Sequence, residues 1–232
     1  MAASPVTPAQ TPASTSVDAF LEAARGVPAT RAARGRLIFA LDATMSRQTT
    51  WDMAATLQGK MFEVAATTGG LDVQLVYFRG LAECRVSRFV GDGAGLAQMM
   101  SNIQVQGGQT QWRRALTHAR DEARRAKVGA LVIVGDAMEE NPDALATIAG
   151  DLAMLGVKIF AFQEGVEEIA RRTFQELARL TGGAYSSFDA GSAKRLTSLL
   201  KAAAAYASGG RAGLAVAAAR DGDALKLLRQ MG

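Results

Sequence analysis

The sequence has almost none of the side chains that build disulfides and zinc sites. Cys84 is the only cysteine and His118 the only histidine among 232 residues. No intramolecular disulfide can form, and no set of Cys and His ligands is present that could hold a structural Zn²⁺. A lone histidine also lacks an evident orienting partner for acid–base chemistry. We therefore interpret Cys84 as a small core residue and His118 as a residue on a helix surface.

Long apolar runs and aromatic residues are also scarce. No stretch approaches the ~20 apolar residues of a membrane-spanning helix, and the N-terminus has no basic region followed by an apolar segment. Aromatic residues make up 6% of the chain and the net charge is +4. The densest basic run, residues 113–127, is interrupted by Asp121 and Glu122, whereas nucleic-acid binding combines a basic face with aromatic residues or a recognisable module. We expect a cytoplasmic protein with no membrane or nucleic-acid partner.

The composition changes along the chain and predicts four segments. Residues 1–16 are rich in Pro, Ala, Ser and Thr and are expected to form a disordered tail. Residues 17–33 are expected to form a short helix and a linker. Residues 34–206 carry regular apolar patterns and are expected to form the folded domain. Residues 207–232 begin with a glycine-rich stretch, which we interpret as a linker before a short C-terminal helix.

The apolar patterns of the central segment alternate between strands and helices. Continuous apolar runs are typical of buried parallel strands, and apolar residues at three- and four-residue intervals are typical of helices. Strands are expected at residues 37–41, 71–78, 82–89, 131–135, 157–162 and 184–187, and helices at 49–67, 96–103, 111–126, 142–155, 167–180 and 192–206. This order predicts an α/β fold with a doubly wound, Rossmann-like and mostly parallel six-stranded sheet, helices on both faces and one antiparallel edge strand at residues 82–89.

Three oxygen-bearing side chains follow the first predicted strand at alternate positions. They are Asp42, Thr44 and Ser46. Alternate side chains of an extended segment point the same way, so these groups are expected to converge beyond the carboxyl end of the strand. Open α/β sheets bind their ligands at this edge. A carboxylate and two hydroxyls are hard oxygen donors, which suit Mg²⁺ or Mn²⁺.

Two further residues extend this candidate metal site. Thr110 follows a Gly-Gly turn before a predicted helix, and Asp136 ends a central strand. Each residue also has a purely structural interpretation: Ser46 and Thr110 as helix caps, and Asp42 and Asp136 as turn residues. If a helix begins at Thr110, its N-terminus would favour an incoming carboxylate. We predict that Asp42, Thr44, Ser46, Thr110 and Asp136 surround one Mg²⁺ or Mn²⁺.

In this pattern the sequence resembles the von Willebrand factor A domain family. The Asp-x-Thr-x-Ser stretch at residues 42–46, Thr110 and Asp136 match the family's metal-ion-dependent adhesion site, and Thr181-Gly182-Gly183 before Tyr185 resembles the stretch preceding its last strand. The resemblance covers residues 34–206. It implies a non-enzymatic adaptor in which a partner's Asp or Glu completes the coordination of the metal, with intracellular members serving larger complexes that include ATPase machines.

The sequence departs from the family pattern, and two alternative functions stay open. Thr44 replaces a Ser, and Ala137, then Glu139 and Glu140, follow the last Asp where the family often has Gly. A haloacid dehalogenase-type phosphatase would use Asp42 as nucleophile and Mg²⁺ to offset charge, but it lacks an acid at position 44. A scaffold of the same fold with a vestigial metal site is the other alternative.

Overall fold

The computed structural model describes residues 34–44, 70–189 and 192–231, and residues 34–232 belong to one compact unit. The expected tail at 1–16, the expected helix and linker at 17–33, the expected helix at 49–67 and the candidate ligand Ser46 lie outside the described residues. No helix in these described ranges is long and apolar enough to cross a membrane.

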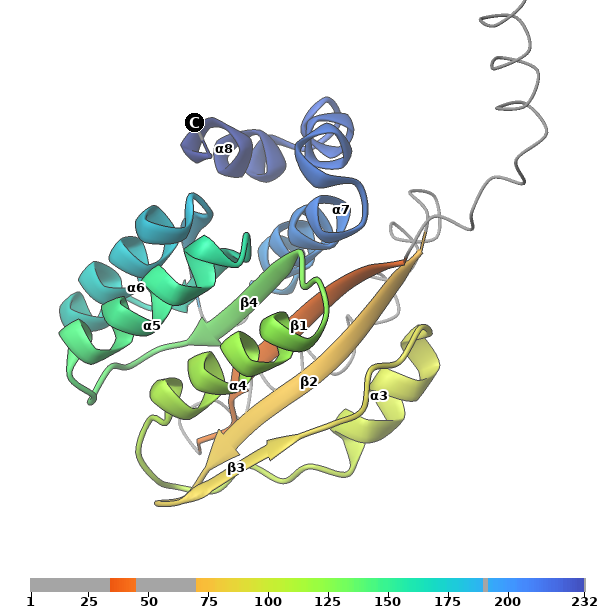
Figure 1. Ribbon diagram of the computed structural model, residues 1–232. Helices are drawn as coiled ribbons and strands as arrows, with labels where there is room; N and C mark the ends of the chain where they lie inside the picture. The colour runs from red at the N-terminus through yellow and green to blue at the C-terminus, as the bar shows by residue number, and fades with distance from the viewer. Residues whose placement is uncertain (1–33, 45–69, 190–191, 232) are drawn as a thin grey trace, which may run out of the picture. The chain divides into compact units, whose positions relative to one another are not determined.

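The six strands form one sheet, and the predicted fold class is confirmed (Figure 1). The order is β3-β2-β1-β4-β5-β6, with only β3 antiparallel to its neighbour. The strands are β1 (Gly35–Asp42), β2 (Leu71–Arg79), β3 (Glu83–Val86), β4 (Ala130–Gly135), β5 (Lys158–Glu164) and β6 (Ala184–Phe188). The chain leaves β1 for β2 on one side and returns with β4 on the other, so β1 and β4 flank the point at which the strand order reverses.

The antiparallel edge strand is shorter than the sequence predicts. It ends at Val86. The Ser87 amide still donates to the Leu75 carbonyl, but the Leu75 amide donates to the Ser87 side-chain hydroxyl at 2.9 Å, so a side chain takes the place of the strand backbone as acceptor. The pairing resumes only as an isolated bridge between Val73 and Val90. Cys84 is half-buried against the core, and burial raises the pKa of its thiol.

Helices cover both faces of the sheet, with α4 crossing in front of it in Figure 1. Alternate residues of β1 face opposite layers: Ile38 and Ala40 pack under α4, α5 and α6, and Leu37 and Phe39 pack toward α3, α7 and α8. The helices are α3 (Gly93–Ser101), α4 (Trp112–Arg125), α5 (Pro142–Met154), α6 (Glu168–Thr181), α7 (Ala193–Ala218) and α8 (Gly222–Gln230).

The glycine-rich stretch expected to be a linker is a short kink between two helical segments. It lies within α7, which turns sharply at Gly210 (φ 59°, ψ −153°) and then continues as a helix. This backbone conformation favours glycine. A Cβ at Gly213 would lie 2.3 Å from the Ala205 carbonyl oxygen, so the two halves of α7 approach closely. Leu214 and, in α8, Leu227 are buried in the same cluster as β1, so the C-terminal helices add to the core.

Candidate metal centre

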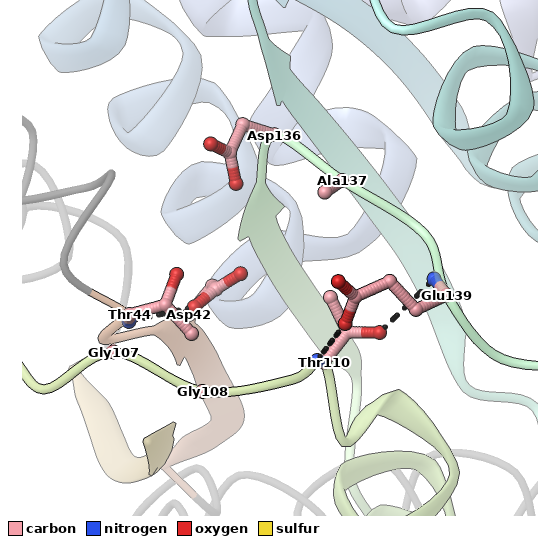
Figure 2. Close-up of a pocket in the computed structure, with 8 residues that line it drawn as sticks. All are labelled: Asp42, Thr44, Gly107, Gly108, Thr110, Asp136, Ala137 and Glu139. Atoms are coloured by element: carbon pink, nitrogen blue, oxygen red, sulfur yellow. Dashed lines mark hydrogen bonds between the residues drawn. The ribbon is translucent and has the colours of Figure 1, made fainter. Parts of the chain in front are cut away.

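A cavity of about 210 Å³ opens at the carboxyl edge of the sheet, where β1 and β4 separate. It is lined by Asp42, Thr44, Gly107, Gly108, Thr110, Asp136, Ala137 and Glu139. Figure 2 shows Asp42 and Thr44 together on one side, Thr110 and Glu139 together on another, and Asp136 at the end of β4. Four of the five predicted ligands therefore line one cavity, and the fifth, Ser46, lies outside the described residues.

A turn, and not an extended segment, brings Asp42 and Thr44 to the cavity. β1 ends at Asp42, and the Thr44 amide donates to Asp42 Oδ1 at 2.8 Å. A carboxylate that accepts from the amide two residues later is a common way for Asp to stabilise a turn. Both residues are almost fully buried. The sequence predicted that an extended backbone would bring these two side chains to the same place. A turn closed by a local hydrogen bond does so instead.

Glycine lets the segment before α4 form one wall of the cavity. The Gln106 amide donates to the Ala43 carbonyl at 3.1 Å, and the Gln109 amide donates to the Gly80 carbonyl at 3.1 Å. Between them, a Cβ at Gly108 would lie only 2.0 Å from the Gly80 oxygen. Any other residue at 108 would push this wall away from the ends of β1 and β2.

Thr110 is held by Glu139 and does not cap the following helix. The Thr110 amide donates to Glu139 Oε2 at 2.8 Å, and the Glu139 amide donates to Thr110 Oγ1 at 3.2 Å (Figure 2). α4 begins only at Trp112, with Gln111 as its N-cap residue. The structural interpretation of Thr110 as a cap is therefore wrong. The hydroxyl lies at the cavity, tied to a loop 29 residues away in the sequence.

Glu140 occupies the N-terminus of α4. Its carboxylate accepts hydrogen bonds from the Trp112 amide and, at 3.0 Å, from the Arg113 amide. Burial raises the pKa of Glu140, and these two amide bonds act in the opposite direction. The expected favourable field of this helix is therefore already used by a carboxylate of the protein itself. An incoming acid would have to be attracted by something else.

Asp136 is the residue whose surroundings fit a cation best. It follows Gly135, where a Cβ would lie 2.4 Å from the Trp112 ring, so the strand end is packed tightly against α4. Asp136 Oδ1 is buried and accepts no hydrogen bond from the described residues. A buried carboxylate oxygen without a partner is costly. A bound cation would remove this cost.

The donors suit a cation that accepts carboxylate and hydroxyl oxygens together. In the described part of the chain, no three His, Cys, Asp or Glu side chains come close enough together to hold an ion by themselves. A cation here would need the hydroxyls of Thr44 and Thr110 as well. Glu139 was noted in the sequence only as an extra acid near Asp136. Its place in the cavity depends on its contact with Thr110, which no local pattern signals.

Comparison with known proteins supports the fold but does not identify a function. No protein-family model and no curated protein sequence matches this chain. Solved structures do match, among them a von Willebrand factor type A protein from Catenulispora acidiphila, with 15% identity, a TM-score of 0.59, and 75% of this chain and 43% of that one covered. The SpRpn10 VWA domain matches with 12% identity and a TM-score of 0.55, over 76% of this chain and 97% of that one.

A third match is a structure that holds a metal of its own. It is proximal thread matrix protein 1 from the mussel byssus, described as having a zinc-occupied MIDAS motif, with 16% identity and a TM-score of 0.59 over 74% of this chain and 46% of that one. The chain thus spans less than half the length of the bacterial and mussel proteins. These matches define the fold as that of von Willebrand factor A domains.

Proposed function

We propose that this protein is a metal-dependent protein-binding module, and that Asp42, Thr44, Ser46, Thr110 and Asp136 hold one Mg²⁺ or Mn²⁺ at the carboxyl edge of the sheet. The observation that carries this proposal is the buried, unpartnered oxygen of Asp136 in a cavity shared with two threonine hydroxyls and a second aspartate. Hard oxygen donors of this kind favour Mg²⁺ or Mn²⁺. The zinc in the mussel protein supports divalent binding by this fold in general.

The partner would supply a carboxylate to the metal. Hydroxyl ligands are neutral, so they leave part of the charge of the cation uncompensated, and Mg²⁺ readily keeps positions for outside ligands. An Asp or Glu of another protein fits such a position. Since the N-terminus of α4 is already bound by Glu140, the cation itself would provide the attraction for this acid.

The alternatives receive less support. The phosphatase would need an acid at position 44 to protonate the leaving group, and Thr44 has a hydroxyl that does not serve this role. We therefore propose a non-enzymatic adaptor, acting in the cytoplasm and serving a larger assembly such as an ATPase complex. The first experiment must distinguish this proposal from the other alternative, a scaffold with a vestigial metal site.

That experiment is a thermal unfolding series with Mg²⁺, with Mn²⁺ and with EDTA. We expect both ions to raise the melting temperature of the wild-type protein, and the Asp42→Ala variant to lose the rise. An unchanged melting temperature over a wide Mn²⁺ range would favour the vestigial site. In the same preparations, Mg²⁺-dependent hydrolysis of a phosphate monoester that Asp42→Asn abolishes would overturn the binding-module proposal.

A further inference from the structure

Exposed apolar side chains lie on both sides of the candidate metal centre. Leu81 is 78% exposed in the turn that follows β2, and Val166 is 89% exposed in the connection that follows β5. Ile169, three positions after Val166 and in the first turn of α6, is 55% exposed. Single exposed apolar residues are common on protein surfaces. These three residues are not scattered singly over the surface. They follow the carboxyl ends of β2 and β5, the two strands that flank β1 and β4.

The strand register shows that Leu81 and Val166 both follow, in the chain, residues that lie level with the two aspartates. Asp42 pairs with Phe78, so Leu81 lies three residues beyond the partner of Asp42. On the other side Gly135 pairs with Gln163, so Val166 lies two residues beyond the level of Asp136. Both apolar residues thus extend past the strand ends, one to either side of the two aspartates.

The turn that contains Leu81 also contacts the wall of the cavity, through the neighbouring residue Gly80. Gly80, the residue before Leu81, accepts the hydrogen bond of the Gln109 amide at 3.1 Å, and its backbone lies against Gly108. Gly108 lines the cavity. A ligand that reaches the cation over this wall would therefore pass beside Leu81.

The spacing of the sheet gives the distance between the two strands that the apolar residues follow. β2 and β5 are separated by β1 and β4, hence by three strand spacings of ~4.8 Å, or about 14 Å. An extended peptide advances ~3.3 Å per residue, so four residues cover about 13 Å. A side chain at the midpoint of such a peptide would reach the cation between β1 and β4.

We propose that the partner binds through an extended segment that crosses the strand ends, with its acidic residue on the cation and an apolar residue two positions before and two positions after it. This inference rests on the proposed function, because the cation fixes the centre of the segment. Leu81 would contact one apolar side chain, and Val166 with Ile169 the other.

The charges near Val166 are compatible with such a segment. The Glu167 carboxylate accepts from the Ile169 and Ala170 amides at 2.9 and 2.5 Å, so it caps α6. Glu168 is bridged by Arg171 and Arg172. Because both acids have partners, Val166 and Ile169 offer apolar contact without a free carboxylate at residues 167 and 168, which favours an uncharged residue of the partner on this side of the central acid.

The first test is a positional-scanning library of fluorescent peptides with a central Glu. Binding of each peptide to the protein is measured by fluorescence in millimolar Mg²⁺ and in EDTA. At each flanking position in turn, all residues are compared on a Ser/Gly background. We expect Mg²⁺-dependent binding that is strengthened about tenfold by Leu, Ile or Phe at either position two residues from the Glu, a size typical of burying part of an apolar side chain. Mg²⁺-dependent binding without this preference would overturn the inference and leave the proposed function standing. No Mg²⁺-dependent binding of any peptide would overturn both.

The second test uses protein variants with the preferred peptide. Leu81→Ser and Val166→Ser should each weaken binding about tenfold, each cancelling the preference on its own side of the Glu. Met154→Ser is the matched control, because Met154 is 90% exposed but lies at the end of α5 that leads into the amino end of β5. Sedimentation of the protein alone in Mg²⁺ completes the test. A dimer that Leu81→Ser dissociates would assign this face to a second copy of the chain and overturn the inference.

Discussion

The charged side chains at the two ends of β1 differ in whether they have partners of opposite charge. At the amino end, Arg34 forms an ion pair with Asp72 at 2.7 Å and also donates to two carbonyl oxygens. Arg36 contacts Glu122 at 3.3 Å and lies over the Phe89 ring at 3.7 Å. At the carboxyl end, three carboxylates line one cavity, and two of them, Asp136 and Glu139, form no ion pair with any described residue.

This difference separates structural charges from candidate functional ones. A charge beside an opposite charge is compensated within the fold and needs no ligand, whereas the carboxyl end holds a buried carboxylate oxygen of Asp136 without a partner among the described residues. Carboxylates that gather around a cavity repel each other and favour a cation from outside. The amino end therefore predicts effects on stability alone, and the carboxyl end predicts effects on ligand binding.

The largest effect is expected from neutralising Asp136. Asp136→Asn keeps the shape of the side chain but removes its charge, so the affinity for Mn²⁺ should fall by about 100-fold or more, since even outer-shell substitutions cost 10–100-fold. In EDTA the variant should be as stable as wild type or more stable, because a buried carboxylate oxygen without a partner is gone. Mn²⁺ titration and urea unfolding measure the two quantities.

Asp72→Asn is the matched control at the other end of β1. It breaks the ion pair with the half-exposed Arg34, which should cost about 0–1 kcal/mol of unfolding free energy. The Mn²⁺ affinity should not change. The comparison between the two ends would fail if Asp72→Asn weakened metal binding, or if Asp136→Asn left it intact.

The second effect concerns how Thr110 is held. Glu139→Ala removes the acceptor of the Thr110 amide, so the hydroxyl should lose its fixed position and the Mn²⁺ affinity should fall about tenfold. Glu139→Gln retains an acceptor and removes the charge. If Glu139 acts by positioning Thr110, the Gln variant should bind Mn²⁺ nearly as well as wild type. Equal losses in both variants would mean that the charge of Glu139 matters directly.

Glu140 should separate stability from metal binding within the same loop. Glu140→Ala leaves the Trp112 and Arg113 amides without their acceptor, which should cost about 1–2 kcal/mol of unfolding free energy. The Mn²⁺ affinity should stay near that of wild type, because Glu140 does not line the cavity. Glu168→Ala, on the exposed surface of α6, is the control and should cost less. A large loss of metal affinity in Glu140→Ala would show that the whole loop supports the site.

The sequence predicted the central strands well and the connection between the C-terminal helices poorly. Residues 131–135 were expected as a strand and β4 runs Ala130–Gly135, because a strand buried on both faces needs a continuous apolar run. The glycines at 209, 210 and 213 suggested a linker, but they serve a sharp turn at Gly210 and a close approach at Gly213. Composition alone does not distinguish glycine that loosens a chain from glycine that lets helices pack.

The residues that line the cavity were largely predictable, but the hydrogen bonds that hold its loops were not. Asp42 and Asp136 follow central parallel strands, whose carboxyl ends meet at one edge, and both line the cavity. The paired hydrogen bonds of Thr110 and Glu139, and the occupation of the α4 N-terminus by Glu140, join residues 28 or 29 positions apart through the conformation of a loop. The assignment of the five residues as metal ligands remains a prediction that the Mn²⁺ titrations test.

The smallest effect is expected far from both ends of β1, at the only histidine. His118 was expected on a helix surface, but it is half-buried on α4 with Nε2 2.8 Å from the Gln74 side-chain oxygen on β2. Burial lowers the pKa of His118 below its ordinary value of 6.5, with Arg125 acting in the same direction and Glu122 and Asp121 opposing it. The unfolded chain therefore binds a proton more readily than the folded protein does.

It follows that the contribution of His118 to stability is fully present above pH 6.5 and is lost as the pH falls through the lower, folded-state pKa. Urea unfolding at pH 7.5 and pH 5.5, compared between wild type and His118→Gln, isolates this contribution from the carboxylates that titrate in both proteins. Wild type should lose more stability on acidification than the variant does. An equal loss would mean that the imidazole is solvated in the folded protein, and a larger loss in the variant would reverse the sign of the argument.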